Sequence, residues 1–174
     1  MLRPTVETAT QKRRNNLGYT HYWTLKGCAP AEEWSAACKD IRKLLKAQPG
    51  LVRFESEDPS PPLIDALEIR FNGVGNKGHE TFTVCSSGQT GSHMPGWAFC
   101  KTARKDYDLL VTACLLVLKA HMPLWIKLES DGRWERRYEG AYADGWGPAA
   151  HLCAGVLGYV DNDFVLAKQD LART

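Results

Sequence analysis

The chain has 174 residues, enough for one domain with a substantial hydrophobic core, and its formal net charge is only +2. Such a small charge excludes a protein that coats nucleic acid through its overall charge, although it permits a local basic patch. No stretch holds the long uncharged apolar run that a membrane-spanning helix needs, so we expect no membrane partner.

Residues 1–16 lack the apolar segment of a signal peptide and are predicted to form a flexible basic arm. Residues 17–174 are predicted to fold as a single domain. The six cysteines include no C-x-x-C pair, so their spacing favours neither a zinc site nor a thioredoxin-type motif. The sequence therefore predicts a reduced, cytoplasmic protein without a disulfide, a metal ion or a cofactor.

The first elements of the domain are predicted to be a strand and a helix. Residues 17–25 alternate, which places Tyr19, His21 and Trp23 on one face of a strand. A helix is predicted from Pro30 to about Gln48, followed by a short strand over residues 51–55. Four residues at helical spacing should form the buried stripe of this helix: Trp34, Cys38, Ile41 and Leu45.

The second half of the domain should hold several strands and one long buried helix. The pattern predicts strands over four segments, residues 65–73, 79–85, 124–128 and 133–138. Residues 106–121 should form the central helix, because residues 109–118 are apolar on almost every side. Residues 148–157 should form a last short helix. Adjacent strands without intervening helices predict an α+β fold, in which an antiparallel-rich sheet packs against two main helices.

Basic residues precede the long helix and could form an anion site. Lys101, Arg104 and Lys105 lie directly before it, where free backbone N–H groups and the helix dipole favour negative charge. Asp106 can cap this helix, and Asp108 suits its first turn. The simpler alternative is that these cations are solvated charges of a loop.

His21 and Glu80 fall on the apolar faces of two predicted strands, where an ionisable group needs a partner or water. Glu80 could pair with Lys101, Arg70 or His21, or simply reach water from a strand edge. His21 is either a satisfied core histidine or part of a pocket wall, and we expect it to face Glu80 or Lys101 in a shared pocket.

Aromatic side chains and one asparagine bear on the choice of ligand. Tyr19, Trp23 and Trp97 can stack on a planar ring, although large aromatic residues more often belong to the core. Asn72 can read the edge of a nucleobase or simply end its strand. The sequence contains no Walker loop, no G-x-G-x-x-G, G-x-S-x-G or H-E-x-x-H motif, and no pair of H-x-T motifs.

Four motifs carry a resemblance to a known family: GYTHYW from Gly18, IRFNGVGNKGHETF from Ile69, FCKTARKDYD from Phe99 and SDG from Ser130. In this order they resemble a family of small, uncharacterised proteins encoded by bacteria and their phages. The resemblance covers roughly residues 18–146, and the chain departs from it at Asp106, where the family favours proline. Occurrence in phages implies a counter-defence role, which is an association and not a derivation from the residues.

These observations favour a phage-type counter-defence protein that binds and sequesters a nucleotide-derived immune signal, of cyclic-nucleotide or ADP-ribose type, in a pocket. One alternative is a metal-independent, phosphodiesterase-like hydrolase, with His21 or Glu80 as general base and Lys101 stabilising the phosphoryl charge. The other is an inhibitor that acts through surface contact without a small ligand. No extended nucleic acid is expected as a partner, and the sequence is compatible with a homo-oligomer. The predicted ligand-binding residues are His21, Trp23, Asn72, Glu80, Lys101, Thr102, Arg104 and Asp108.

Overall fold

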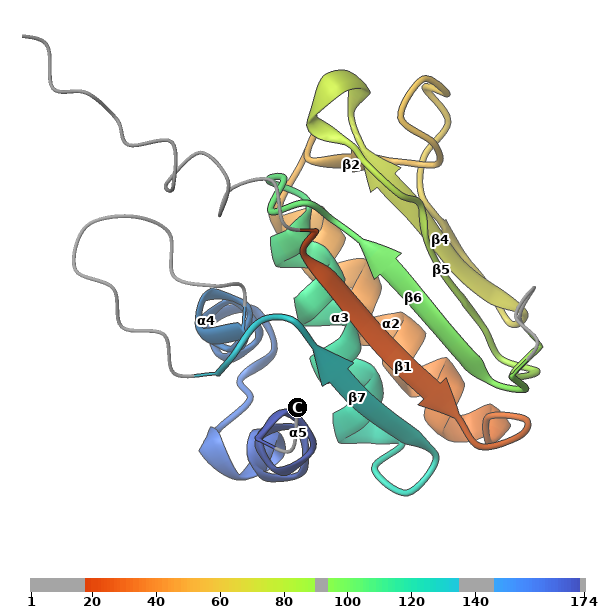
Figure 1. Ribbon diagram of the computed structural model, residues 1–174, viewed down its shortest axis with the longest axis vertical. Helices are drawn as coiled ribbons and strands as arrows, with labels where there is room; N and C mark the ends of the chain where they lie inside the picture. The colour runs from red at the N-terminus through yellow and green to blue at the C-terminus, as the bar shows by residue number, and fades with distance from the viewer. Residues whose placement is uncertain (1–17, 90–93, 135–145, 173–174) are drawn as a thin grey trace, which may run out of the picture.

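The computed structural model describes residues 18–89, 94–134 and 146–172 (Figure 1). The predicted arm and most of the strand predicted at 133–138 lie outside the described residues. Within them, helices and antiparallel sheets combine in an α+β fold, as the sequence predicts. None of the described helices is both long and apolar enough to cross a membrane.

The strand β1 (Thr20–Leu25) is the centre of a three-stranded sheet. The strand β6 (Trp97–Lys101) pairs with one side of β1 and β7 (Ile126–Ser130) with the other, both antiparallel to it. Consequently β6 and β7 run parallel to each other, and the helix α3 (Asp108–His121) makes the crossover between them. This arrangement brings the first turn of α3 close to the start of β1 and the end of β7.

The strand β4 (Glu68–Gly73) organises a second sheet. It pairs with β5 (Phe82–Cys85) on one side and with the short strands β2 (Val52–Arg53) and β3 (Leu63–Ile64) on the other, all antiparallel. A 3-10 turn, η1 (Gly75–Lys77), lies between β4 and β5. Because β5 lies beside β6, the two sheets continue each other around a common core (Figure 1).

The helices α2 (Ala31–Ala47) and α3 pack against the inner face of the β1 sheet (Figure 1). From Leu110 to Lys119 every residue of α3 is buried, which confirms that it is the central helix. Leu44 is buried and Leu45 only half-buried, so the predicted stripe of α2 is wrong at its last position. The observed stripe is Trp34, Ala37, Cys38, Ile41 and Leu44.

The C-terminal part adds α4 (Trp146–Leu157), a 3-10 turn η2 (Asp161–Phe164) and α5 (Val165–Leu171). The helix α4 matches the predicted last helix, whereas α5 has no counterpart in the sequence prediction. The carboxylate of Asp170 in α5 accepts a hydrogen bond from the Leu128 backbone N–H at 3.1 Å and lies 2.7 Å from Lys119 Nζ. Since the Lys119 side chain is only 7% exposed, this ion pair fastens α5 to the core along the edge of β7.

Three predictions are wrong at the ends of elements. Asp106 does not cap α3: its exposed carboxylate lies 3.9 Å from Lys77 Nζ, and the helix begins two residues later. Leu124 is outside β7 and 78% exposed, because a turn closed on the Met122 carbonyl precedes the strand. Glu80 lies before β5 begins and is half-buried.

Candidate functional site

The inner face of β1 carries the histidine that the sequence singles out. Tyr19, His21, Trp23 and Leu25 are each at most 2% exposed, which confirms the alternation predicted for this strand. The ring of Trp23 packs against Phe82 with 5.2 Å between the ring centroids. Trp23 is therefore a core residue, beyond the reach of a ligand ring.

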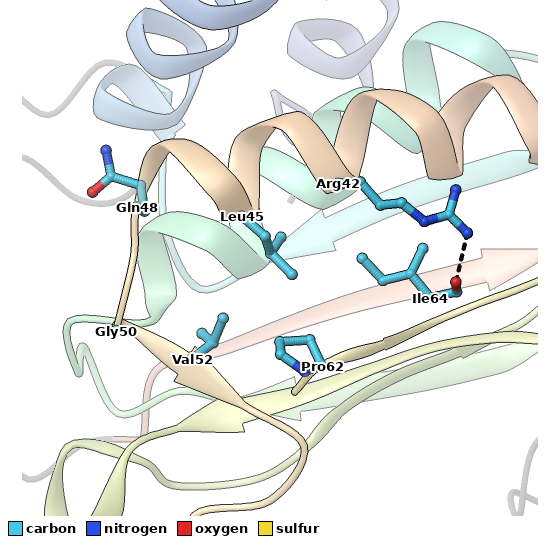
Figure 2. Close-up of a pocket in the computed structure, with 7 residues that line it drawn as sticks. All are labelled: Arg42, Leu45, Gln48, Gly50, Val52, Pro62 and Ile64. Carbon is cyan, nitrogen blue, oxygen red and sulfur yellow. Dashed lines mark hydrogen bonds between the residues drawn. The ribbon is translucent and has the colours of Figure 1, made fainter. Parts of the chain in front are cut away.

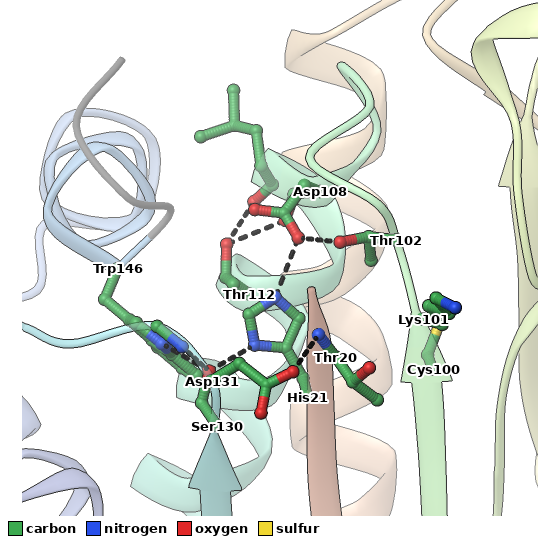
Figure 3. Close-up of polar contacts among 12 residues, drawn as sticks. Thr20, His21, Cys100, Lys101, Thr102, Asp108, Thr112, Ser130, Asp131 and Trp146 are labelled. Carbon is green, nitrogen blue, oxygen red and sulfur yellow. Dashed lines mark hydrogen bonds and ion pairs between the residues drawn. The ribbon is translucent and has the colours of Figure 1, made fainter. Parts of the chain in front are cut away.

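His21 lies at the centre of a polar network (Figure 3). Its Nε2 is 2.7 Å from Oδ1 of Asp108, in the first turn of α3, and its Nδ1 is 2.8 Å from Oγ of Ser130, at the end of β7. The Thr102 hydroxyl donates a further hydrogen bond to the same oxygen of Asp108. Three of the predicted residues, His21, Thr102 and Asp108, are thus brought together.

The hydrogen bonds around Ser130 fix the proton positions in this network. Its Oγ accepts hydrogen bonds from the Gly132 backbone N–H at 2.9 Å and from Nε1–H of Trp146 at 3.3 Å. Because both lone pairs of the hydroxyl are engaged, its own proton points to Nδ1 of His21. His21 then carries its proton on Nε2 and donates it to Asp108.

The order serine, histidine, aspartate is that of a hydrolase triad, but this network is enclosed. His21 is 0% and Ser130 6% exposed. Gly132 sits so close to Tyr19 that a Cβ atom there would lie 2.1 Å from the Tyr19 hydroxyl oxygen. Among the described residues these groups enclose Ser130, so the network acts as a buried support between β1, β7, α3 and α4.

Lys101 and Glu80 lie away from His21. The strand register places Cys100 opposite His21, so Lys101 points to the other face of the sheet. The Glu80 carboxylate accepts a hydrogen bond from the Lys101 backbone N–H at 2.7 Å, and its carbonyl accepts one from the Tyr107 hydroxyl at 2.6 Å. The shared pocket expected for His21, Glu80 and Lys101 is therefore not formed.

Asn72 stabilises a turn. It is 2% exposed, its Nδ2 donates to the His79 carbonyl at 3.0 Å and to Thr81 Oγ1 at 3.1 Å, and its Oδ1 accepts the Gly73 and His79 N–H groups. These bonds join the end of β4 to the segment before β5 and occupy the groups that would read a base edge.

Arg104 lies over an aromatic ring at the edge of the His21 network. Its guanidinium carbon is 4.2 Å from the centroid of the Tyr19 ring. Ala103 and Arg104 both have positive φ values, 51° and 55°, so the chain turns sharply after β6. After this turn the guanidinium of Arg104 packs on the Tyr19 ring, and the hydroxyl of the same tyrosine lies against Gly132, two residues after Ser130.

Three cavities lie beside α2 and away from all the predicted ligand residues. One, of about 360 Å³, is lined by Arg42, Leu45, Gln48, Gly50, Val52, Pro62 and Ile64 (Figure 2). A second, of about 250 Å³, also has Arg42 in its lining, and a third, of about 580 Å³, is lined by residues of α2 from Ala31 to Arg42. Nη2 of Arg42 donates a hydrogen bond to the Ile64 carbonyl at 2.6 Å, so this arginine joins α2 to β3. One of its donors is therefore not available to a ligand.

The outer face of the β1 sheet carries an aromatic patch formed by Tyr22, Trp97 and Phe99. The Tyr22 and Trp97 rings are stacked, with centroids 6.0 Å apart, and the Phe99 ring lies 6.3 Å from Tyr22 and 5.4 Å from Trp97. Phe99 is 48% exposed and the other two are half-buried. Since α2 and α3 cover the opposite face, this patch faces solvent (Figure 1).

Several of these residues were missed by the sequence analysis. The alternation of Trp97, Phe99 and Lys101 along one strand was a usable signal for the patch, yet only Trp97 and Lys101 were singled out. Ser130 begins the SDG motif, but nothing in the sequence links it to His21, which is 109 positions away and meets it only through the pairing of β1 with β7.

Comparisons with known proteins assign neither a family nor an activity to this arrangement. No family model, no curated protein and no solved structure matches the chain. The function is therefore inferred from the geometry and chemistry of the described residues.

Proposed function

We propose that the protein binds a nucleotide-type ligand by stacking a base on the aromatic patch, and that it sequesters this ligand. The observation that carries the proposal is the cluster of Tyr22, Trp97 and Phe99 on the solvent face of a sheet. A folded chain normally buries such rings, and adjacent exposed ones favour a binding surface. Stacking on them contributes about 1–3 kcal/mol per base.

Cations beside the patch supply partners for phosphate. Lys101 follows Phe99 at the next outward position of β6, and Lys127 pairs across β1 with the same threonine, Thr24, as Trp97 does. An ammonium group next to a stacking ring suits a nucleotide, which joins a planar base to an anion.

Sequestration fits the geometry better than cleavage does. The Ser130–His21–Asp108 network is enclosed on the inner face of the sheet, whereas the aromatic patch is on the outer face. A ligand on the patch therefore meets no part of this network. The setting rests on the family resemblance: we propose counter-defence in the host cytoplasm, with a cyclic-nucleotide or ADP-ribose-type signal as ligand.

The test is calorimetric titration with AMP, cyclic AMP and ADP-ribose. Tyr22→Leu and Phe99→Leu should each weaken binding at least about fivefold, because each removes a stacking surface. Phe54→Leu is the matched control, since it removes a half-buried ring that directly follows β2, away from the patch. Binding that survives both patch variants but is lost in Arg42→Ala would move the site to the cavity beside α2.

Two further outcomes separate the alternatives. Ligand recovered intact after heat denaturation of the complex supports sequestration, and cleavage products would support a hydrolase. If no nucleotide binds and the protein sediments as a dimer that Phe99→Lys dissociates, the patch is a contact between copies.

A further inference from the structure

We infer that the ligand of the aromatic patch carries two bases joined through phosphate, as a cyclic or linear dinucleotide does, and not one base as ADP-ribose does. This inference rests on the proposed function and specifies the ligand of the same surface. It follows from how the rings are distributed over the strands.

The pairing register divides the outer face of the β1 sheet into rows that cross the strands. Tyr22 and Phe99 lie opposite each other in one row, and Trp97 lies opposite Thr24 in the next. Neighbouring rows on one face are two residues apart, which is about 6.6–6.8 Å. The rings therefore occupy two successive rows, a spacing that suits neighbouring bases of an extended dinucleotide.

The tilt between the rings prevents one base from using them all. The Trp97 and Phe99 rings are inclined by 45°, and those of Tyr22 and Phe99 by 42°. A planar base that stacks on Trp97 cannot lie parallel to Phe99 at the same time. Two bases, one over Trp97, whose ring is inclined by only 27° to Tyr22, and one over Phe99, can each stack on a ring face.

The charges along the rows fit phosphates at more than one point. Lys101 lies one row beyond Phe99, Lys127 lies in the row of Trp97, and Glu129 lies opposite Tyr22 in the middle row, so the patch has a cation at each end and one carboxylate between them. Lys127 Nζ is 2.8 Å from Oε1 of Glu129, and both side chains are exposed. This exposed pair is weakly held and can open toward an anion, whereas a mononucleotide would engage only one of the two cations.

The experiment compares four probes by calorimetry at one salt concentration: cyclic diadenylate, linear diadenylate, AMP and ADP-ribose. The two-base probes should bind about 5- to 150-fold tighter than the one-base probes, which is the effect of one more stacked base. Trp97→Leu should lower the affinity for the two-base probes to nearly that for AMP, and it should change the affinity for AMP much less. Trp97→Tyr should restore the difference, and Phe54→Leu should leave it unchanged.

The outcomes separate this inference from the proposed function. If AMP and ADP-ribose bind as tightly as the dinucleotides, the two-base ligand is overturned and nucleotide binding stands. If affinity keeps rising from diadenylate to tetra-adenylate, the ligand is an extended strand and the inference also fails. If no probe binds, or if binding survives Tyr22→Leu and Trp97→Leu together, the proposed function fails too. Preference for cyclic over linear diadenylate would identify the linkage.

Discussion

At the scale of single residues, His21 shows how a polar side chain is kept inside the core. Both ring nitrogens are hydrogen-bonded, one to Oδ1 of Asp108, which also accepts from Thr102, and one to Oγ of Ser130, which also accepts from Gly132 and Trp146. Removing the imidazole would leave a buried carboxylate and a buried hydroxyl without their partner, which costs more than the loss of one hydrogen bond.

We expect His21→Ala to lower the free energy of unfolding by about 3 kcal/mol while nucleotide binding to the aromatic patch is retained. Lys101→Ala, a change on the outer face, should alter stability by less than about 0.5 kcal/mol. Urea unfolding and calorimetry measure the two effects. A stable His21→Ala protein that no longer binds nucleotide would contradict this and support the hypothesis that His21 lies in a ligand pocket.

At the scale of elements, α3 joins the other helices to the sheet of β1. It contacts α2, α4, α5 and β7, and its residues from Leu110 to Lys119 have no solvent-facing side. When a side chain of such a helix is shortened, the packed elements around it cannot all relax into the cavity that forms, so the substitution is costly.

Leu110→Ala and Leu115→Ala should each lower the free energy of unfolding by about 2–5 kcal/mol, because both residues are 0% exposed. Leu67→Ala is the control: the same deletion at a side chain that is 73% exposed should cost well under 1 kcal/mol. Denaturant unfolding measures all three. Equal losses at Leu67 and Leu110 would mean that α3 is not central.

At the scale of the whole molecule, a half-buried cluster ties three segments together. The Asp40 carboxylate of α2 lies 3.0 Å from Nε2 of His121, at the end of α3, and accepts hydrogen bonds from the Tyr159 hydroxyl at 3.1 Å and from Lys43. Burial alone would raise the pKa of Asp40, but the hydrogen bonds from Lys43, His121 and Tyr159 outweigh it and hold this pKa below its ordinary value.

This cluster predicts a loss of stability in acid. Because the folded-state pKa of Asp40 is lower than the unfolded value of about 3.9, its contribution is complete above that value and disappears as the pH falls through the folded pKa. Asp40→Asn should therefore be less stable than wild type at neutral pH, and the difference should shrink as the pH falls below the unfolded value of about 3.9. Asp161→Asn, at a carboxylate that is 96% exposed, should show no such convergence in urea unfolding.

The fold could be predicted largely from local patterns. Periodicity predicts most of the elements, because each of them buries either one face or its whole surface. These are the helices α2, α3 and α4 and the strands β1, β4, β5 and β7. The helix α5 could not be predicted in this way, since its contribution depends on Asp170 meeting Lys119 and the edge of β7.

The site could be predicted only in part. The sequence placed His21 on an inner face and Asp108 in the first turn of a helix, and the structure joins them. It could not supply the register of β6 against β1, which separates Lys101 from His21 and sets the rows of the aromatic patch. Pairing register depends on contacts between distant segments and therefore has no local signature.

The position of α5 has a consequence for synthesis of the chain. Until Asp170 has been added, the backbone N–H of Leu128 lacks its acceptor, Lys119 keeps its bonds to the Pro123 and Ile126 carbonyls but has no carboxylate partner, and the outer edge of β7 is open. An open strand edge is a template for pairing with a second chain. Chains that lack α5 should therefore aggregate through β7, because α5 protects this strand edge in the folded domain.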